Sequence, residues 1–81
     1  MDEGRVTELA KEAIKESKRN DCEFISVRAV EAGAWRIELM DVMLKQEPFT
    51  VSVSAQDAAS DSAIKESIRR SVAEHYSLAS Y

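Results

Sequence analysis

Two stretches with helical periodicity stand near opposite ends of this 81-residue chain, with a strand-rich segment between them. The first runs from Arg5 to Arg19, and its apolar residues follow the spacing of one helix face: Val6, Leu9, Ala10, Ala13 and Ile14. The second extends to about Tyr76, and its apolar residues recur every four positions: Ile64, Ile68, Val72 and Tyr76. A chain with this arrangement is expected to pack two amphipathic helices against a sheet.

Two local patterns support the helix assignment. The pentapeptide AIKES occurs in both stretches, as Ala13 to Ser17 and as Ala63 to Ser67. The residues around the two copies match poorly, so shared helix-forming composition explains the repeat better than a duplication does. Ser54 followed by Asp57 is a capping-box pattern, which predicts that the last helix begins there.

Three segments between the helices have the composition of strands. Cys22 to Glu31 is rich in Phe, Ile and Val, and Phe49 to Ser54 alternates apolar and polar residues without a break. Trp35 to Leu44 is ambiguous, because its Leu, Met and Glu residues also favour helix, but pairing with its neighbours favours strand. The sequence therefore predicts one α+β domain over residues 1–81. Its order is α-β-β-β-α, a three-stranded antiparallel meander with both helices packed on one face.

A three-residue loop from Ala32 to Ala34 sets the register that we expect for the first hairpin. It gives four sensible cross-strand pairs: Arg28 with Glu38, Val27 with Leu39, Ala29 with Ile37, and Phe24 with Val42. A second loop from Lys45 to Pro48 then gives three more: Leu44 with Phe49, Val42 with Val51, and Met40 with Val53. In this register the third strand is too short to accompany the hairpin past about Leu39.

The same register predicts that the apolar residues change faces halfway along the sheet. The expected core face contains Cys22, Phe24, Met40, Val42, Leu44, Phe49, Val51 and Val53. Towards the first hairpin that face becomes polar, with Ser26, Arg28, Arg36 and Glu38. The apolar set then lies on the opposite face: Val27, Ala29, Trp35, Ile37 and Leu39.

This second apolar set has two interpretations. With no helix left to cover it, it predicts a surface that binds a partner, most simply a second copy of the chain, which lets one patch cover itself. Alternatively, a β-bulge in each strand, near Ser26 and near Met40 to Asp41, rotates the hairpin and returns its apolar side to the helices.

Composition and charge narrow the classes of function. The net charge is -4, with 11 basic and 15 acidic side chains mixed along the chain, which disfavours nucleic acid as a partner. The single cysteine excludes an intramolecular disulfide. No stretch reaches the roughly 20 apolar residues of a membrane span, and the acidic start of the chain leads us to expect no secretory signal. We expect a cytoplasmic protein without a cofactor, a metal or a small-molecule substrate.

The side chains most often used in catalysis are sparse here. His75 is the only histidine, and we expect it on the surface near the end of the last helix. Cys22 lies between Asp21 and Glu23, which disfavour its thiolate. We therefore do not expect an enzyme. A pocket that joins His75 to Cys22 or to a carboxylate would reopen that possibility.

Basic residues on the two helices offer the second class of function, a nucleic-acid-associated protein. They are Lys15, Lys18, Arg19, Arg69 and Arg70. Interleaved Glu residues make a solvated helix face the simpler explanation.

Two resemblances bear on this choice. The order of elements resembles that of the double-stranded-RNA-binding domain, a family with a lysine-rich start to its second helix. The matching stretch here, Ala55 to Asp61 (AQDAASD), contains no Lys or Arg, so no residue is carried over. In size and acidic balance the chain is also similar to small phage-encoded inhibitors, anti-CRISPR proteins among them, which act purely as binding surfaces. We expect a non-catalytic protein-protein interaction module, self-associating or binding another protein through the first hairpin.

Overall fold

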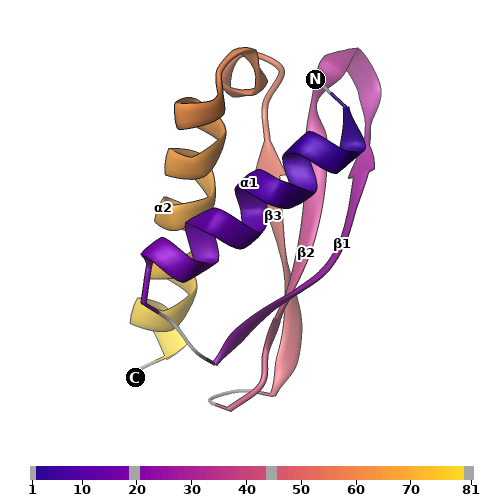
Figure 1. The fold of residues 1–81 in the computed structure, drawn as a ribbon. Coiled ribbons are helices and arrows are strands. Elements are labelled where there is room, and N and C mark those ends of the chain that lie inside the picture. The colour runs from indigo at the N-terminus through magenta and orange to yellow at the C-terminus, as the bar shows by residue number, and fades with distance from the viewer. Residues whose placement is uncertain (1, 19–20, 44–45, 80–81) are drawn as a thin grey trace.

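The computed structural model describes residues 2–18, 21–43 and 46–79, and its architecture is the predicted α-β-β-β-α (Figure 1). The helices are α1 (Glu3–Glu16) and α2 (Asp61–Ala79), and the strands are β1 (Cys22–Ala29), β2 (Trp35–Asp41) and β3 (Glu47–Val53). The strands form one antiparallel sheet in the order β1-β2-β3. The predicted α+β fold class is confirmed.

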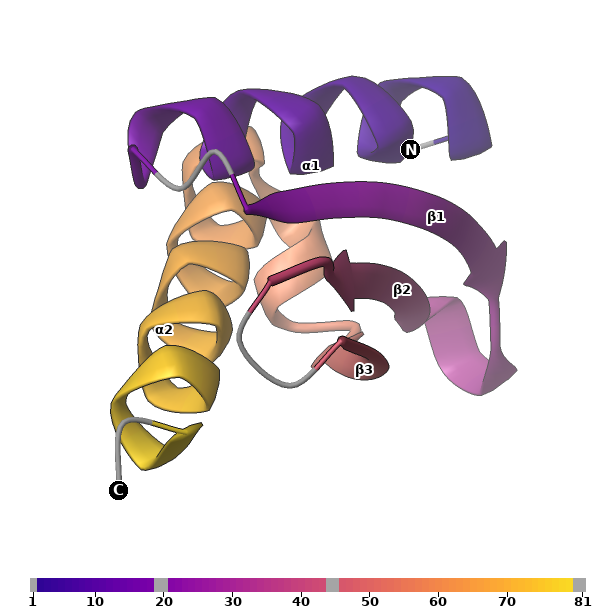
Figure 2. The ribbon, with the colours of Figure 1, turned by 90° about the horizontal axis from the view of Figure 1, so that it is seen from below.

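Both helices lie on the same side of the sheet. In Figure 1, α1 crosses diagonally in front of the strands, and α2 runs along the β3 side. Figure 2 shows the same layering from below, with α1 against β1 and with α2 at a steep angle to α1. The opposite face of the sheet is left without a covering element among the described residues.

The helix stripes predicted from periodicity form the core. All nine stripe residues, from Val6 on α1 to Tyr76 on α2, are buried. From the sheet they meet Trp35, Ile37 and Leu39 of β2 with Val51 and Val53 of β3. No helix among the described residues is long and apolar enough to cross a membrane.

Local capping explains where the helices begin. Asp2 accepts a hydrogen bond from the Arg5 backbone N–H at 2.8 Å and starts α1. The Ser54 hydroxyl accepts from the Asp57 N–H at 3.1 Å, but this pair opens only a short 3-10 turn, Asp57–Ala59. The Ser60 hydroxyl accepts from the Ala63 N–H at 3.2 Å, so α2 starts at Asp61 and the predicted start at Ser54 is wrong.

The register of the first hairpin differs from the prediction. Val27 pairs with Ile37, Arg28 with Arg36, and Ala29 with Trp35. The reason is the connection, which spans residues 30–34 and closes with a hydrogen bond from the Val30 N–H to the Ala34 carbonyl at 3.0 Å. Ala32 and Gly33 both adopt left-handed backbone conformations, with φ of 56° and 79°, which the longer turn requires.

The second hairpin differs by more. Trp35 pairs with Val53, Ile37 with Val51, and Leu39 with Phe49, so β3 accompanies β2 along its full length. The predicted pairs Val42 with Val51 and Met40 with Val53 are wrong, and Leu44 lies outside the described residues. The offset is an odd number of residues, so the opposite set of β2 side chains joins the core.

One of the two proposed bulges is present. The β1 register shifts between Phe24 and Ser26, so Ile25 has no partner in the ladder, while β2 pairs without irregularity on its other side. The bulge lets both Phe24 and Val27 pack against the core and leaves Ile25 and Ser26 exposed.

Candidate functional site

The predicted partner patch is part of the core. Trp35 is 9% exposed, and Ile37 and Leu39 are 0% exposed. Val27 packs partly buried against them, and Ala29 alone is exposed, at the end of β1. The prediction of an exposed apolar patch on this side of the hairpin is therefore wrong, because the true register turns it towards the helices.

The other side of the sheet, which we call the uncovered face, carries the available side chains. It is formed by alternate strand residues, with both bulge residues of β1 included: Glu23, Ile25, Ser26, Arg28, Arg36, Glu38, Met40, Pro48, Thr50 and Ser52. Most of these residues are exposed, and none belongs to the buried core. A partner that approaches the sheet meets this set first.

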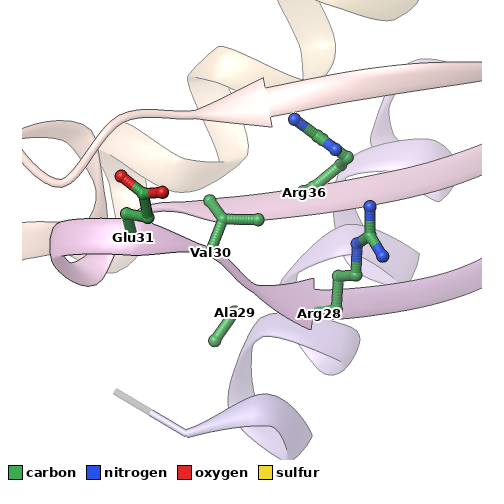
Figure 3. A pocket seen from close by; sticks show the side chains of 5 residues that line it. All are labelled: Arg28, Ala29, Val30, Glu31 and Arg36. Atoms are coloured by element: carbon green, nitrogen blue, oxygen red, sulfur yellow. The ribbon is translucent and has the colours of Figure 1, made fainter.

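Two arginines lie directly opposite each other on this face. Arg28 of β1 and Arg36 of β2 are cross-strand partners, and both are exposed. Figure 3 shows their side chains on neighbouring strands beside Val30 and Glu31 of the hairpin. Like charges in this position destabilise a sheet by roughly 0.2–1 kcal/mol. No ion pair or side-chain hydrogen bond among the described residues includes either arginine.

Two hollows adjoin this arginine pair and share it. The larger, of about 540 Å³, is lined by Arg28, Ala29, Val30, Glu31 and Arg36 at the hairpin end (Figure 3). The smaller, of about 210 Å³, is lined by Ser26, Arg28, Arg36, Glu38 and Thr50 over the middle of the sheet. Guanidinium groups, hydroxyls and carboxylates therefore alternate over a short distance.

The far end of the uncovered face mixes apolar residues with one carboxylate. Ile25 is 44% exposed, and Met40 pairs with Pro48 of β3 on one side and with the exposed Glu23 of β1 on the other. An apolar group beside charged groups is the usual composition of a protein-binding surface.

Of the helical cations proposed for nucleic acid, Arg69 is paired with carboxylates, and so is the neighbouring Lys65. Lys65 and Arg69 both donate to Glu16 at 2.6 Å, and Arg69 also donates to Glu66 at 2.8 Å. The hydrogen bond from Lys65, with Arg69 beside it, holds the pKa of Glu16 below its ordinary value. Lys15, Lys18 and Arg70 are exposed, and Arg19 lies outside the described residues.

His75 is not the surface residue that we expected. Its Nε2 lies 3.0 Å from the Oδ2 of Asp41, a carboxylate that is 0% exposed, and its ring stacks on Phe49 with centroids 3.9 Å apart. Asp41 also accepts from the Met43 N–H at 3.2 Å. The pair joins α2 to the end of β2. Neither His75 nor Asp41 lines any of the three hollows of about 540, 210 and 370 Å³ that described residues form.

Cys22 and Tyr76 belong to the same buried region. The Tyr76 hydroxyl donates to the Asp21 carbonyl at 3.2 Å, and burial, with Cys22, Asp21 and Asp41 nearby, raises the pKa of the phenol. Cys22 also borders a hollow of about 370 Å³ with Lys11, Ile14, Glu23 and Phe24. No group of three or more potential metal ligands occurs among the described residues.

Comparison with known proteins gave no relative for this chain. No family model matches it, and neither a curated protein nor a solved structure does.

Proposed function

We propose that this protein is a non-catalytic protein-interaction module and that its contact surface is the uncovered face of the sheet. The observation that supports this most is the Arg28–Arg36 pair, two like charges placed side by side without an ion-pair partner among the described residues. Such a pair lowers the stability of the free domain and gains from an external carboxylate. Ile25, exposed on the same face, adds an apolar contact.

Several features favour a protein over a nucleic acid as the partner. Sheets that bind single-stranded nucleic acid place aromatic side chains on the exposed face for base stacking. Here Phe24, Trp35 and Phe49 all pack on the helix side. Glu31 and Glu38 flank the two arginines and would repel phosphates. The net charge of -4 adds to that repulsion.

The arrangement of His75 supports a structural role for this residue. A general base needs access to a substrate, and His75 is instead held between Asp41 and the Phe49 ring. The uncovered face instead presents Arg28, Arg36 and Met40, residue types that are enriched at protein interfaces.

Site-specific photo-crosslinking tests the proposal. p-Benzoylphenylalanine replaces Thr50 on the uncovered face or, as the matched control, Lys15 on the exposed side of α1. In the cells that make this protein, we expect discrete protein adducts from position 50 but not from position 15. These adducts should disappear when Ile25→Asp is added. Equal adducts from both positions, or none from position 50, would contradict the proposal.

A second measurement separates the nucleic-acid alternative. Fluorescence anisotropy with labelled duplex RNA and duplex DNA at low salt should show no specific binding. Tight, salt-dependent binding that is lost in Arg28→Glu and Arg36→Glu would replace the protein partner with a nucleic acid.

A further inference from the structure

Arg36 and Glu38 on the central strand, β2, form a charge pattern that is complementary to the same two residues on a copy of β2 running in the opposite direction. Arg36 and Glu38 are two residues apart on β2 and share the uncovered face, so they stand roughly 6.6 Å apart along the strand. Neither side chain has an ion pair among the described residues. With Arg28 and Glu31 beside them, the local charges cancel. A partner of mixed charge fits this pattern better than a polyanion does.

We propose that the partner of the uncovered face is a second copy of this chain, packed face to face about a two-fold axis, with Arg36 of each copy on Glu38 of the other. This inference rests on the proposed function and names its partner. A two-fold interface uses the same patch twice, so each residue contact occurs in both directions.

The register gives this arrangement its geometry. A two-fold axis that lies between the two sheets and crosses β2 at Ile37 reverses the strand direction. It places Arg36 over Glu38 of the second copy, because the two residues are equally far from Ile37. Arg28 is level with Arg36 on β1, so each Glu38 faces both arginines of the other copy. Four like-charged guanidinium groups thereby gain two carboxylates.

The same two-fold arrangement also gives Met40 a position against the second copy. Met40 is three residues from Ile37 in one direction and Ala34 three residues in the other, so the same rotation brings Met40 to the level of Ala34. Val30 is hydrogen-bonded to Ala34 and lines the hollow of about 540 Å³ at the hairpin end. A thioether side chain adapts well to such a space.

An acidic protein segment is less well matched to the same surface. It would satisfy Arg28 and Arg36 but would place its carboxylates near Glu31 and Glu38. A second copy brings both signs of charge in the required order.

Charge reversal tests the inference in solution. Sedimentation equilibrium of the full chain should show a dimer whose dissociation constant rises roughly 30-fold or more in Arg36→Glu and in Glu38→Arg. The double variant, Arg36→Glu with Glu38→Arg, restores the opposite-sign contacts and should bring the constant back to within about tenfold of wild type. Arg70→Glu, an equal charge change on exposed α2, should leave it within about threefold.

The outcomes separate this inference from the proposed function. A wild-type chain that stays monomeric at millimolar concentration overturns the proposal of a second copy. A double variant that dimerises as weakly as the two single variants overturns it too. If adducts of another protein still form from position 50, the proposed function stands without this partner. If neither a dimer nor an adduct is seen, both proposals fail. Circular dichroism confirms that each variant is folded.

Discussion

The two faces of the sheet are made from alternate residues of the same strands, yet they differ in almost every property. The face under the helices brings Ile37 and Leu39 of β2 together with Val51 and Val53 of β3, all nearly inaccessible to water. The other face has exposed hydroxyls, two adjacent arginines and, towards one end, the apolar residues Ile25, Met40 and Pro48. The difference teaches that one face supplies the stability of the domain, and that the other is free to carry charges that lower it.

Trp35→Ala is the strongest test of that division. Removing a buried indole from the core should lower the free energy of unfolding by about 3–5 kcal/mol. This is a large part of the 5–15 kcal/mol usual for a domain. Urea unfolding followed by circular dichroism measures the change. Thr50→Ala on the uncovered face is the control and should change it by less than about 0.5 kcal/mol. Equal small effects would show that the two faces are not distinct.

His75→Ala tests how much the contacts of His75 with Asp41 and Phe49 stabilise the helix-covered side of the sheet. The change leaves the fully buried Asp41 carboxylate without its imidazole partner and removes the stacking on Phe49. A loss of about 2–3 kcal/mol is expected in thermal or urea unfolding, because a buried polar group loses a hydrogen-bond partner. His75→Gln, which keeps a hydrogen-bond donor, should recover part of it. A change no larger than that of Thr50→Ala would place His75 outside the stabilising layer.

Arg28→Thr tests whether the charges on the uncovered face lower the stability of the domain. Relieving the like-charge pair with Arg36 should raise the stability of the monomer by roughly 0.2–1 kcal/mol. Urea unfolding at low micromolar concentration measures it, with Arg70→Thr on α2 as the control. Destabilisation by Arg28→Thr would mean that the arginine supports the fold and does not serve a partner.

Glu16→Gln gives the smallest effect and concerns the outer surface of the helices. The Glu16 carboxylate pairs with Lys65 and Arg69, and the Lys65 hydrogen bond keeps its pKa below the ordinary value of 4.5. A lowered folded-state pKa stabilises above the unfolded value and is lost as pH falls through the folded value. Stability should therefore decline less between neutral pH and pH 3 in Glu16→Gln than in wild type. Identical pH profiles would contradict this pairing.

The sequence was sufficient for the elements because their periodicities are strong. The stripes of α1 and α2 leave no other face to bury, and the alternation in β3 has no break. The strand predicted over Trp35 to Leu44 is confirmed for Trp35–Asp41, although its Leu, Met and Glu residues suit a helix. Pattern was decisive wherever one face of an element must be apolar.

Register was not predictable in the same way. Both hairpins close through longer connections than a tight-turn rule suggests. Ala32 takes a left-handed conformation, which an alanine in the sequence does not predict. An odd offset in the second hairpin then exchanges the faces of β2, which turned Trp35 from an expected contact residue into a core residue. The alternation of Trp35, Ile37 and Leu39 with Val51 and Val53 was the available evidence for the true pairing. The predicted three-residue loop instead placed Arg28 opposite Glu38, whereas the structure pairs Arg28 with Arg36.

Hydroxyl-radical footprinting of wild type and Arg36→Glu tests the opposite roles of the two faces most directly. We predict slow oxidation of Trp35 in both proteins, and slower oxidation of Met40 in wild type than in the variant. Met43, which is 68% exposed in the β2–β3 connection, is the internal reference and should react equally in both. Trp35 reacting as readily as Met43, or Met40 reacting at the same rate in both proteins, would contradict the account.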